Sequence, residues 1–222
     1  MTSGKTASMV TSQVDSPARR KVCDAAARRL MEQGYAATTL RQIAEDAGIK
    51  AGSIYHHFAS KEELFVDVFR QGIVVMIDAF QDPDTPADQP VLGHVRAHLG
   101  ALFEHGPYTA SHVTAFFTAP PSVRTAVVPA RDQYEGLWNT MLAEQLRHLN
   151  DKDVALHRLI LFGAMNTTIE WFDVSGNLTL DELAGAITRQ FLHGVASQEV
   201  TPQKVNPRKV TPQKVTPQKV KQ

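Results

Sequence analysis

Residues 38–65 read TTLRQIAEDAGIKAGSIYHHFASKEELF, and they contain the start and stop signals of several short helical elements. Thr39 is followed three residues later by Gln42, which is the signature of a capping box at a helix N-terminus. Apolar residues then recur at helical spacing as far as Gly48, a residue that commonly ends helices. The pattern predicts a helix of only two turns, followed by a tight turn and a second short element.

The second short element is GSIYHHF. Ile54 and Phe58 are four residues apart, so they share one helix face and can be buried together. The side chains left on the other face are Ser53, Tyr55 and His56. Two short helices joined by a tight turn, the second polar on its outer side, match the helix-turn-helix plan, in which one helix enters the major groove of DNA.

Two kinds of DNA contact are expected from this motif. Arg41 and Ser53 are candidates for base edges, because arginine reads guanine bidentately and a small hydroxyl can face a base or a thymine methyl. Other side chains in the motif donate hydrogen bonds to phosphate oxygens. The predicted DNA-binding residues are Thr39, Arg41, Lys50, Ser53, Tyr55, His56 and Lys61. The alternative interpretation is plain core, in which Tyr55 or His57 would be a satisfied interior group.

Helical signals continue along the rest of the chain, and alternating β-branched stretches bounded by Asn-Gly or Asp-Gly turns are absent. The sequence therefore predicts an all-α fold. Pro129 falls inside one helical pattern and predicts a kink or a boundary there. The expected helices cover about 17–34, 40–47, 61–80, 92–105, 109–118, 121–148, 152–172 and 180–196.

The formal charge is zero, with 23 basic and 23 acidic side chains, but the charges are segregated along the chain. Residues 16–65 carry eight basic and six acidic side chains, whereas residues 66–200 carry eight and sixteen. A body with this acidic excess is not expected to lie on a polyanion, so nucleic-acid contact should come from an end of the chain. The last two expected helices are apolar on more than one side, which indicates burial in a subunit interface.

Taken together, the stretch from about Ala18 to Phe80 resembles the N-terminal DNA-binding module of the TetR family of bacterial transcriptional regulators. The elements that carry the resemblance are Gly34-Tyr35, Thr39, Ile43-Ala44, Ala47-Gly48, Tyr55, Phe58, Lys61-Glu62 and Leu64. The resemblance implies three small helices that read operator DNA, a long fourth helix, and a helical domain that binds a ligand. It also implies a homodimer formed through the last two helices, here residues 152–196. Family members usually act as repressors that a small molecule releases from the operator.

The domain division expected on this basis has four parts. They are a disordered N-terminus (1–15), the helix-turn-helix domain (16–62), a helical effector-binding and dimerisation domain (63–198) and a disordered basic tail of TPQKV-like repeats (199–222). Residues 166–195 also resemble the C-terminal block of family members that control lipid or acyl-CoA catabolism. Where such proteins place basic residues suited to a CoA phosphate, this chain has Glu170 and Asp173, which argues against a CoA ligand.

An effector pocket of this kind should be apolar with a few polar groups, so the expected effector is a small apolar or amphipathic molecule. The candidate ligand-binding residues are Phe103, His112, Phe116, Trp138, Met141 and Asn166. Each of them could instead be ordinary core, because aromatic residues at helical spacing fill protein interiors. The overall hypothesis is a ligand-released repressor. The alternative is a ligand-independent DNA-binding adaptor whose C-terminal domain recruits a protein, and a filled core without a cavity would favour it.

Other classes of function find little support in the sequence. His94 and His98 share a helix face and could bind a metal, but no cysteine or carboxylate pattern accompanies them, and a solvated histidine face is the simpler interpretation. No phosphate-binding glycine loop, nucleophile elbow or carboxylate pair in a catalytic motif occurs, so neither an enzyme nor a cofactor is expected. No apolar run reaches the roughly 20 residues of a membrane span. A cytoplasmic protein with no membrane partner is therefore expected.

Overall fold

The computed structural model describes residues 16–83 and 88–196, and within these ranges the chain forms helices and turns without any strand. The all-α prediction is therefore confirmed. The N-terminus and the repeat tail expected to be disordered lie outside the described residues. The α-helices are α1 (Pro17–Ala37), α2 (Leu40–Asp46), α3 (Lys61–Gln81), α4 (Pro90–Phe103), α5 (Pro107–Ala115), α6 (Pro121–Gln145), α7 (Asp151–Asn166) and α8 (Leu180–Ala196). Three short 3-10 helices join them, η1 (Ala51–His56), η2 (Phe116–Thr118) and η3 (Thr167–Glu170).

Several helices begin where the sequence places capping residues. At the start of α2, the hydroxyl of Thr39 accepts from the amide of Gln42 while the Gln42 side chain accepts from the amide of Thr39. The same reciprocal pair forms between Thr179 and Glu182 at the start of α8. Each satisfied amide removes one of the unpaired donors of a helix N-terminus. These short local signals fix where α2 and α8 begin.

The predicted helix end at residue 34 and the predicted interruption at Pro129 behave differently in the structure. Gly34 lies inside the range of α1 but has φ of 75°, a left-handed conformation that glycine adopts without steric cost, so the helix is broken where expected. Pro129 does not form a boundary, because α6 continues through it to Gln145.

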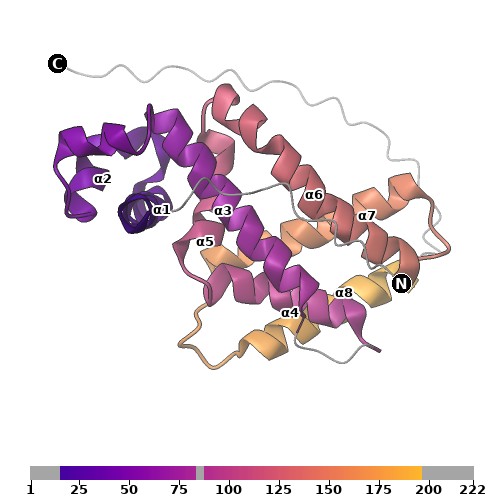
Figure 1. Ribbon diagram of the computed structural model, residues 1–222. Helices are drawn as coiled ribbons and strands as arrows, with labels where there is room; N and C mark the ends of the chain where they lie inside the picture. The colour runs from indigo at the N-terminus through magenta and orange to yellow at the C-terminus, as the bar shows by residue number, and fades with distance from the viewer. Residues whose placement is uncertain (1–15, 84–87, 197–222) are drawn as a thin grey trace, which may run out of the picture.

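The helices form two groups connected by α3. Figure 1 shows α1 and α2 at one end of the molecule and α3 running from that end into the remaining helices. In the second group α3 packs against α4, α5 and α6, and α4 packs against α8. Helix α5 lies at the junction, since it packs against both α1 and α3. A change in the position of α5 would therefore be felt directly by the N-terminal group.

Close contact at this junction depends on Gly72 in α3. A Cβ atom added at Gly72 would lie only 2.6 Å from the backbone carbonyl oxygen of Tyr108 in α5, so a larger residue would push the two helices apart. The Tyr108 hydroxyl in turn donates to Asp24 of α1 at 2.7 Å. Packing against α3 and a hydrogen bond to α1 thus join α5 to the N-terminal group and to the helix that connects the two groups. Among the described helices, none has the length and apolar character needed to cross a membrane.

Candidate DNA-reading surface and effector pocket

The predicted second element of the helix-turn-helix is observed as the 3-10 helix η1, and it is anchored as the sequence indicated. Ile54 is fully buried and Phe58 is 1% exposed, whereas Tyr55 between them is 61% exposed. The interior alternative for Tyr55 is therefore wrong. His57 is half-buried. A rigid apolar underside with an exposed aromatic residue above it is a geometry suited to contact with a macromolecule.

Arg19 of α1 holds this element in place. Its guanidinium lies over the Phe58 ring at 4.0 Å from the centroid, and its Nη1 donates to the backbone carbonyl of His57 at 2.5 Å. The same side chain forms an ion pair with Asp67 of α3. One arginine therefore ties α1, η1 and α3 together, and it fixes the orientation of η1 relative to both helices.

The other residues predicted to bind DNA divide by exposure. Thr39 caps α2, and its side chain remains exposed. Arg41, Lys50 and His56 are also exposed, whereas Ser53 is half-buried. Lys61 differs from them because its Nζ donates to the Tyr35 carbonyl at 2.7 Å and lies 4.3 Å from the centroid of the Tyr35 ring. Partial burial also lowers the pKa of Lys61 below its ordinary value. Lys61 thus stabilises the N-terminal group in this structure, and DNA contact by all seven residues remains a prediction.

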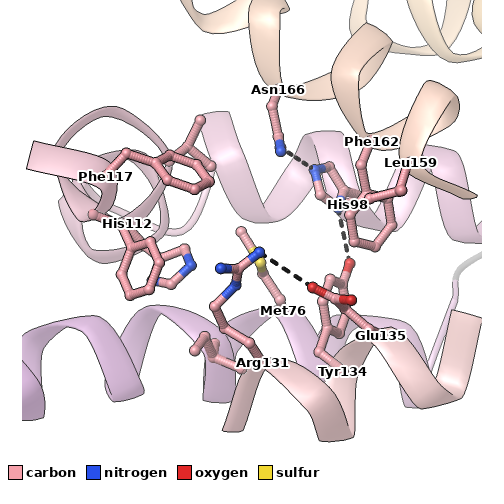
Figure 2. Close-up of a pocket in the computed structure, with 13 residues that line it drawn as sticks. Met76, His98, His112, Phe117, Arg131, Tyr134, Glu135, Leu159, Phe162 and Asn166 are labelled. Atoms are coloured by element: carbon pink, nitrogen blue, oxygen red, sulfur yellow. Dashed lines mark hydrogen bonds and ion pairs between the residues drawn. The ribbon is translucent and has the colours of Figure 1, made fainter. Parts of the chain in front are cut away.

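A cavity of about 170 Å³ lies between α3, α4, α5, α6 and α7. It is the feature expected for a ligand sensor rather than for an adaptor with a filled core. Three candidate residues from the sequence line it, namely His112, Phe116 and Asn166. The other lining residues are Ile73, Met76, His98, Val113, Phe117, Arg131, Tyr134, Glu135, Leu159 and Phe162, several of which are labelled in Figure 2.

Three predicted ligand-binding residues do not line this cavity. Phe103 packs against the ring of Phe172, with 5.1 Å between the centroids. Trp138 is fully buried and packs edge-on against Phe162, so it supports the pocket wall from behind. Met141 is buried in the core. At these positions the alternative of ordinary core describes the observed packing.

An ion-pair network that sequence reasoning missed forms one side of the cavity. Glu135 accepts from Nη2 of Arg131 at 3.2 Å and from Nη2 of Arg158 at 2.8 Å. Arg158 also donates from Nε to Asn139 at 2.9 Å. Arg131 and Glu135 are four residues apart on α6, a spacing that by itself indicates only a surface pair. Their position in a pocket could not be inferred without knowing which face of α6 is covered by α7.

Two buried histidines line the pocket as neutral rings. His98 lies between the Tyr134 hydroxyl at 2.8 Å and Oδ1 of Asn166 at 3.0 Å, so it is not part of a solvated face. Burial lowers the pKa of His98 to about 4. Burial and the nearby Arg131 lower the pKa of His112 to about 3. Within the described residues, no group of three or more His, Cys, Asp or Glu side chains is placed to hold a metal ion.

Acidification is expected to destabilise the fold through His98 and His112. Both folded pKa values lie below the ordinary 6.5, so the unfolded chain gains protons near pH 6.5 that the folded chain does not accept until about pH 4 and 3. The stabilisation is complete above pH 6.5 and is lost as the pH falls toward the folded values. Lowering the pH from 7 to about 5.5 should reduce the free energy of unfolding by about 1.3 kcal/mol for each ring.

Urea unfolding at the two pH values measures this effect. His112→Phe should lose about half of the pH dependence, whereas His148→Gln, a change at an exposed ring, should leave it intact. An unchanged pH dependence in His112→Phe would show that the ring is not held neutral by the fold.

Comparisons with known proteins match both groups of helices. The family profile described as "Bacterial regulatory proteins, tetR family" matches residues 22–68, and the profile "Tetracyclin repressor-like, C-terminal domain" matches residues 85–195. The HTH-type transcriptional repressor KstR2 of Mycobacterium tuberculosis is 27% identical over 198 residues, which cover 86% of this chain and 98% of the relative. The solved structure of the ketosteroid transcriptional regulator KstR2 of M. tuberculosis superposes with a TM-score of 0.66 and 26% identity, covering 82% of this chain and 96% of that one.

A further solved structure supports the fold alone. AibR, crystallised with isovaleryl coenzyme A and operator DNA, has a TM-score of 0.67 and 18% identity, covering 78% of this chain and 98% of that one. The family profiles fall on the N-terminal and C-terminal groups of helices separately, in agreement with the division seen in Figure 1.

Proposed function

Because the chain belongs to the TetR family of bacterial regulatory proteins, whose profiles together match most of it, we propose that it represses transcription as a homodimer and leaves its operator when a small effector fills the C-terminal pocket. The observation that carries the proposal is the position of α5. This helix lines the pocket with His112 and, one turn earlier, bonds to α1 of the N-terminal group through Tyr108. An effector that displaces α5 would therefore act directly on the DNA-reading elements.

Support for repression comes from the relatives. KstR2 proteins from several bacteria, which align with more than four fifths of this chain, are named as transcriptional repressors. The alternative of a ligand-independent adaptor is not favoured, because the C-terminal helices enclose a cavity with charged and polar groups in its wall.

The dimer surface we propose is the outer face of α7 together with α8. After its charged first turn, the exposed residues of α7 form one stripe of apolar and small side chains, namely Leu156, Leu159, Ile160, Gly163 and Ala164. On α8 Leu192 is also exposed. An exposed apolar stripe on a helix is typical of a surface that another helix covers. In a twofold-symmetric dimer, the same surface of a second copy of the chain would pack against this stripe and cover it.

Release by an effector requires only a modest coupling between the pocket and the DNA-reading ends. The two reading elements of a dimer must sit about 34–36 Å apart, or a multiple of that distance, to enter equivalent major grooves. A coupling free energy of about 1–3 kcal/mol changes operator affinity roughly 5- to 150-fold. The close packing of α3 on α5 at Gly72 and the hydrogen bond from Tyr108 to Asp24 are the connections through which such a change would pass.

Operator recognition tests the proposed function through single substitutions in the N-terminal group. Arg41→Ala should relax the sequence preference, because it removes a predicted base contact. Lys50→Ala should weaken binding to all duplexes alike and lower the salt slope by about one, because it removes a predicted phosphate contact. Lys50 serves better than Lys61 here, since replacing Lys61 would also break its bond to Tyr35.

The measurement is selection from a random duplex library, followed by titration of the selected duplex at several salt concentrations. Arg147→Ala, at an exposed arginine near the end of α6, is the matched control and should bind like the parent protein. Failure of the parent protein to prefer any duplex over scrambled competitor would contradict the proposed function. Identical behaviour of Arg41→Ala and Lys50→Ala would contradict the division into base and phosphate contacts.

A further inference from the structure

The pocket carries one positive charge that no described carboxylate balances. Arg131 and Arg158 share the single carboxylate of Glu135, and both pocket histidines are held neutral by burial. Arg158 is nearly buried and directed to Glu135 and Asn139, whereas the side chain of Arg131 retains 30% exposure. Figure 2 shows the Arg131 guanidinium between His112 and Glu135 in the pocket. An uncompensated charge among apolar walls is unfavourable, so this site would gain from an anion.

An anion at Arg131 need not leave Glu135 without a partner. The 2.8 Å contact between Glu135 and Arg158 is shorter than the 3.2 Å contact between Glu135 and Arg131, and Arg158 comes from the neighbouring helix α7. The Arg131 guanidinium can therefore turn toward a ligand while Glu135 remains paired with Arg158. Because guanidinium donors match the two oxygens of a carboxylate, a carboxylic acid is the anion that fits best.

His112 places a second requirement on the ligand, which is a polar group that can form a hydrogen bond with the ring. Its Nδ1 is buried and has no hydrogen-bond partner in the described part of the chain. A hydrogen bond to the backbone of Phe69 raises the pKa of His112 against the effect of burial. In a neutral imidazole each ring nitrogen takes part in one hydrogen bond, either as the donor or as the acceptor. A buried ring nitrogen of this kind calls for a polar group of a molecule in the pocket, and a hydroxyl suits either role because it both donates and accepts.

Size and wall chemistry restrict the rest of the ligand. The cavity of about 170 Å³ is lined by the rings of Phe116, Phe117 and Phe162 and by aliphatic side chains from α3 and α7. A dry apolar cavity of about 150 Å³ holds one benzene molecule. The pocket thus accommodates one aromatic ring or a short branched chain with its polar substituents, and a nucleotide-bearing thioester would not fit inside it.

We propose that the effector is a small hydroxylated carboxylic acid whose carboxylate pairs with Arg131 and whose hydroxyl forms a hydrogen bond with Nδ1 of His112. The proposal rests on the proposed function only in taking this cavity as the effector site. Arg131 selects for the charge and His112 for the hydroxyl, while the aromatic walls hold the ring or branched chain. Neutral molecules of the same shape are rejected, because they leave the guanidinium charge unbalanced.

Isothermal titration of the full-length protein without DNA tests the ligand class. The probes are the three hydroxyphenylacetate isomers and hydroxyisocaproate, each compared with its neutral primary amide, and phenylacetate, which lacks the hydroxyl. At least one hydroxy acid should bind roughly ten- to a hundredfold more tightly than its amide, as expected for a charge-assisted contact. The same acid should bind more tightly than its analogue without the hydroxyl. If no hydroxy acid binds, or if acids and amides bind equally, the proposal is overturned.

Two variants assign the contacts. Arg131→Gln should remove the preference for acid over amide, and His112→Phe should remove only the preference for the hydroxyl, while Arg147→Gln, outside the pocket, should change neither. An acid that binds Arg131→Gln as tightly as the parent protein overturns the proposal. Because these titrations contain no DNA, their failure is distinguishable from failure of the proposed function, which the operator titrations report separately. An acid that binds in these titrations and also releases the protein from the selected duplex would support both the ligand class and the proposed function.

Discussion

Ile160→Asp is expected to convert the proposed dimer to monomers and to weaken operator binding about a thousandfold. The side chain of Ile160 is 58% exposed on the outer face of α7, although apolar residues surround it on the same face. In a twofold interface the substitution places two carboxylates in an apolar contact, where neither has a partner. A monomer engages one half-site alone and loses the roughly 10²- to 10⁴-fold gain of bivalent binding.

The measurement combines sedimentation equilibrium with operator titration at one salt concentration. Val128→Asp is the matched control, because Val128 is also an exposed aliphatic residue within a helix but lies on α6, away from the stripe. The circular dichroism of both variants should match that of the parent protein, since neither position is buried in one copy of the chain. A monomeric Ile160→Asp protein that still binds the operator with parental affinity would refute the dimer requirement.

The sequence predicts those parts of the molecule that depend on local chemistry. The cap at Thr39, the end of the predicted helix 17–34 and the start of the predicted helix 180–196 arise within a few residues of chain, and the structure has the cap at Thr39, a break at Gly34 and the first residue of α8 at Leu180. The buried pair Ile54 and Phe58 follows from helical spacing in the same way, although the element is a 3-10 helix. Pro129 shows the limit of local rules, because helix α6 continues through a residue that commonly ends helices.

The pocket is less predictable because it depends on which helix faces meet. His98 reads as part of a solvated histidine face in the sequence, yet it is buried once α4 packs between α6 and α7 and meets Tyr134 and Asn166. Likewise Arg131 and Glu135 read as an ordinary surface pair, and only the approach of α7 with Arg158 turns them into a pocket wall. Such contacts join residues distant in the sequence, and no local pattern encodes them.

Phe58→Ala is expected to destabilise the N-terminal group of helices by about 3–5 kcal/mol and to abolish operator binding. Phe58 is 1% exposed, so its removal leaves a cavity beneath η1. It also removes the ring over which the Arg19 guanidinium lies, at 4.0 Å, and Arg19 is the residue that ties η1 to α1 and α3. Loss of stability and loss of the reading geometry therefore have the same cause.

Tyr55→Ala separates the two effects, because Tyr55 is an aromatic residue three positions away with its side chain in solvent. We expect this variant to unfold in urea within about 0.5 kcal/mol of the parent protein while still losing operator affinity. Phe58→Leu, which refills most of the cavity, should recover most of the stability and the operator binding of the parent. If Phe58→Ala instead kept parental stability, η1 would not depend on its buried face, and an exposed Tyr55 would have no rigid support from which to contact DNA.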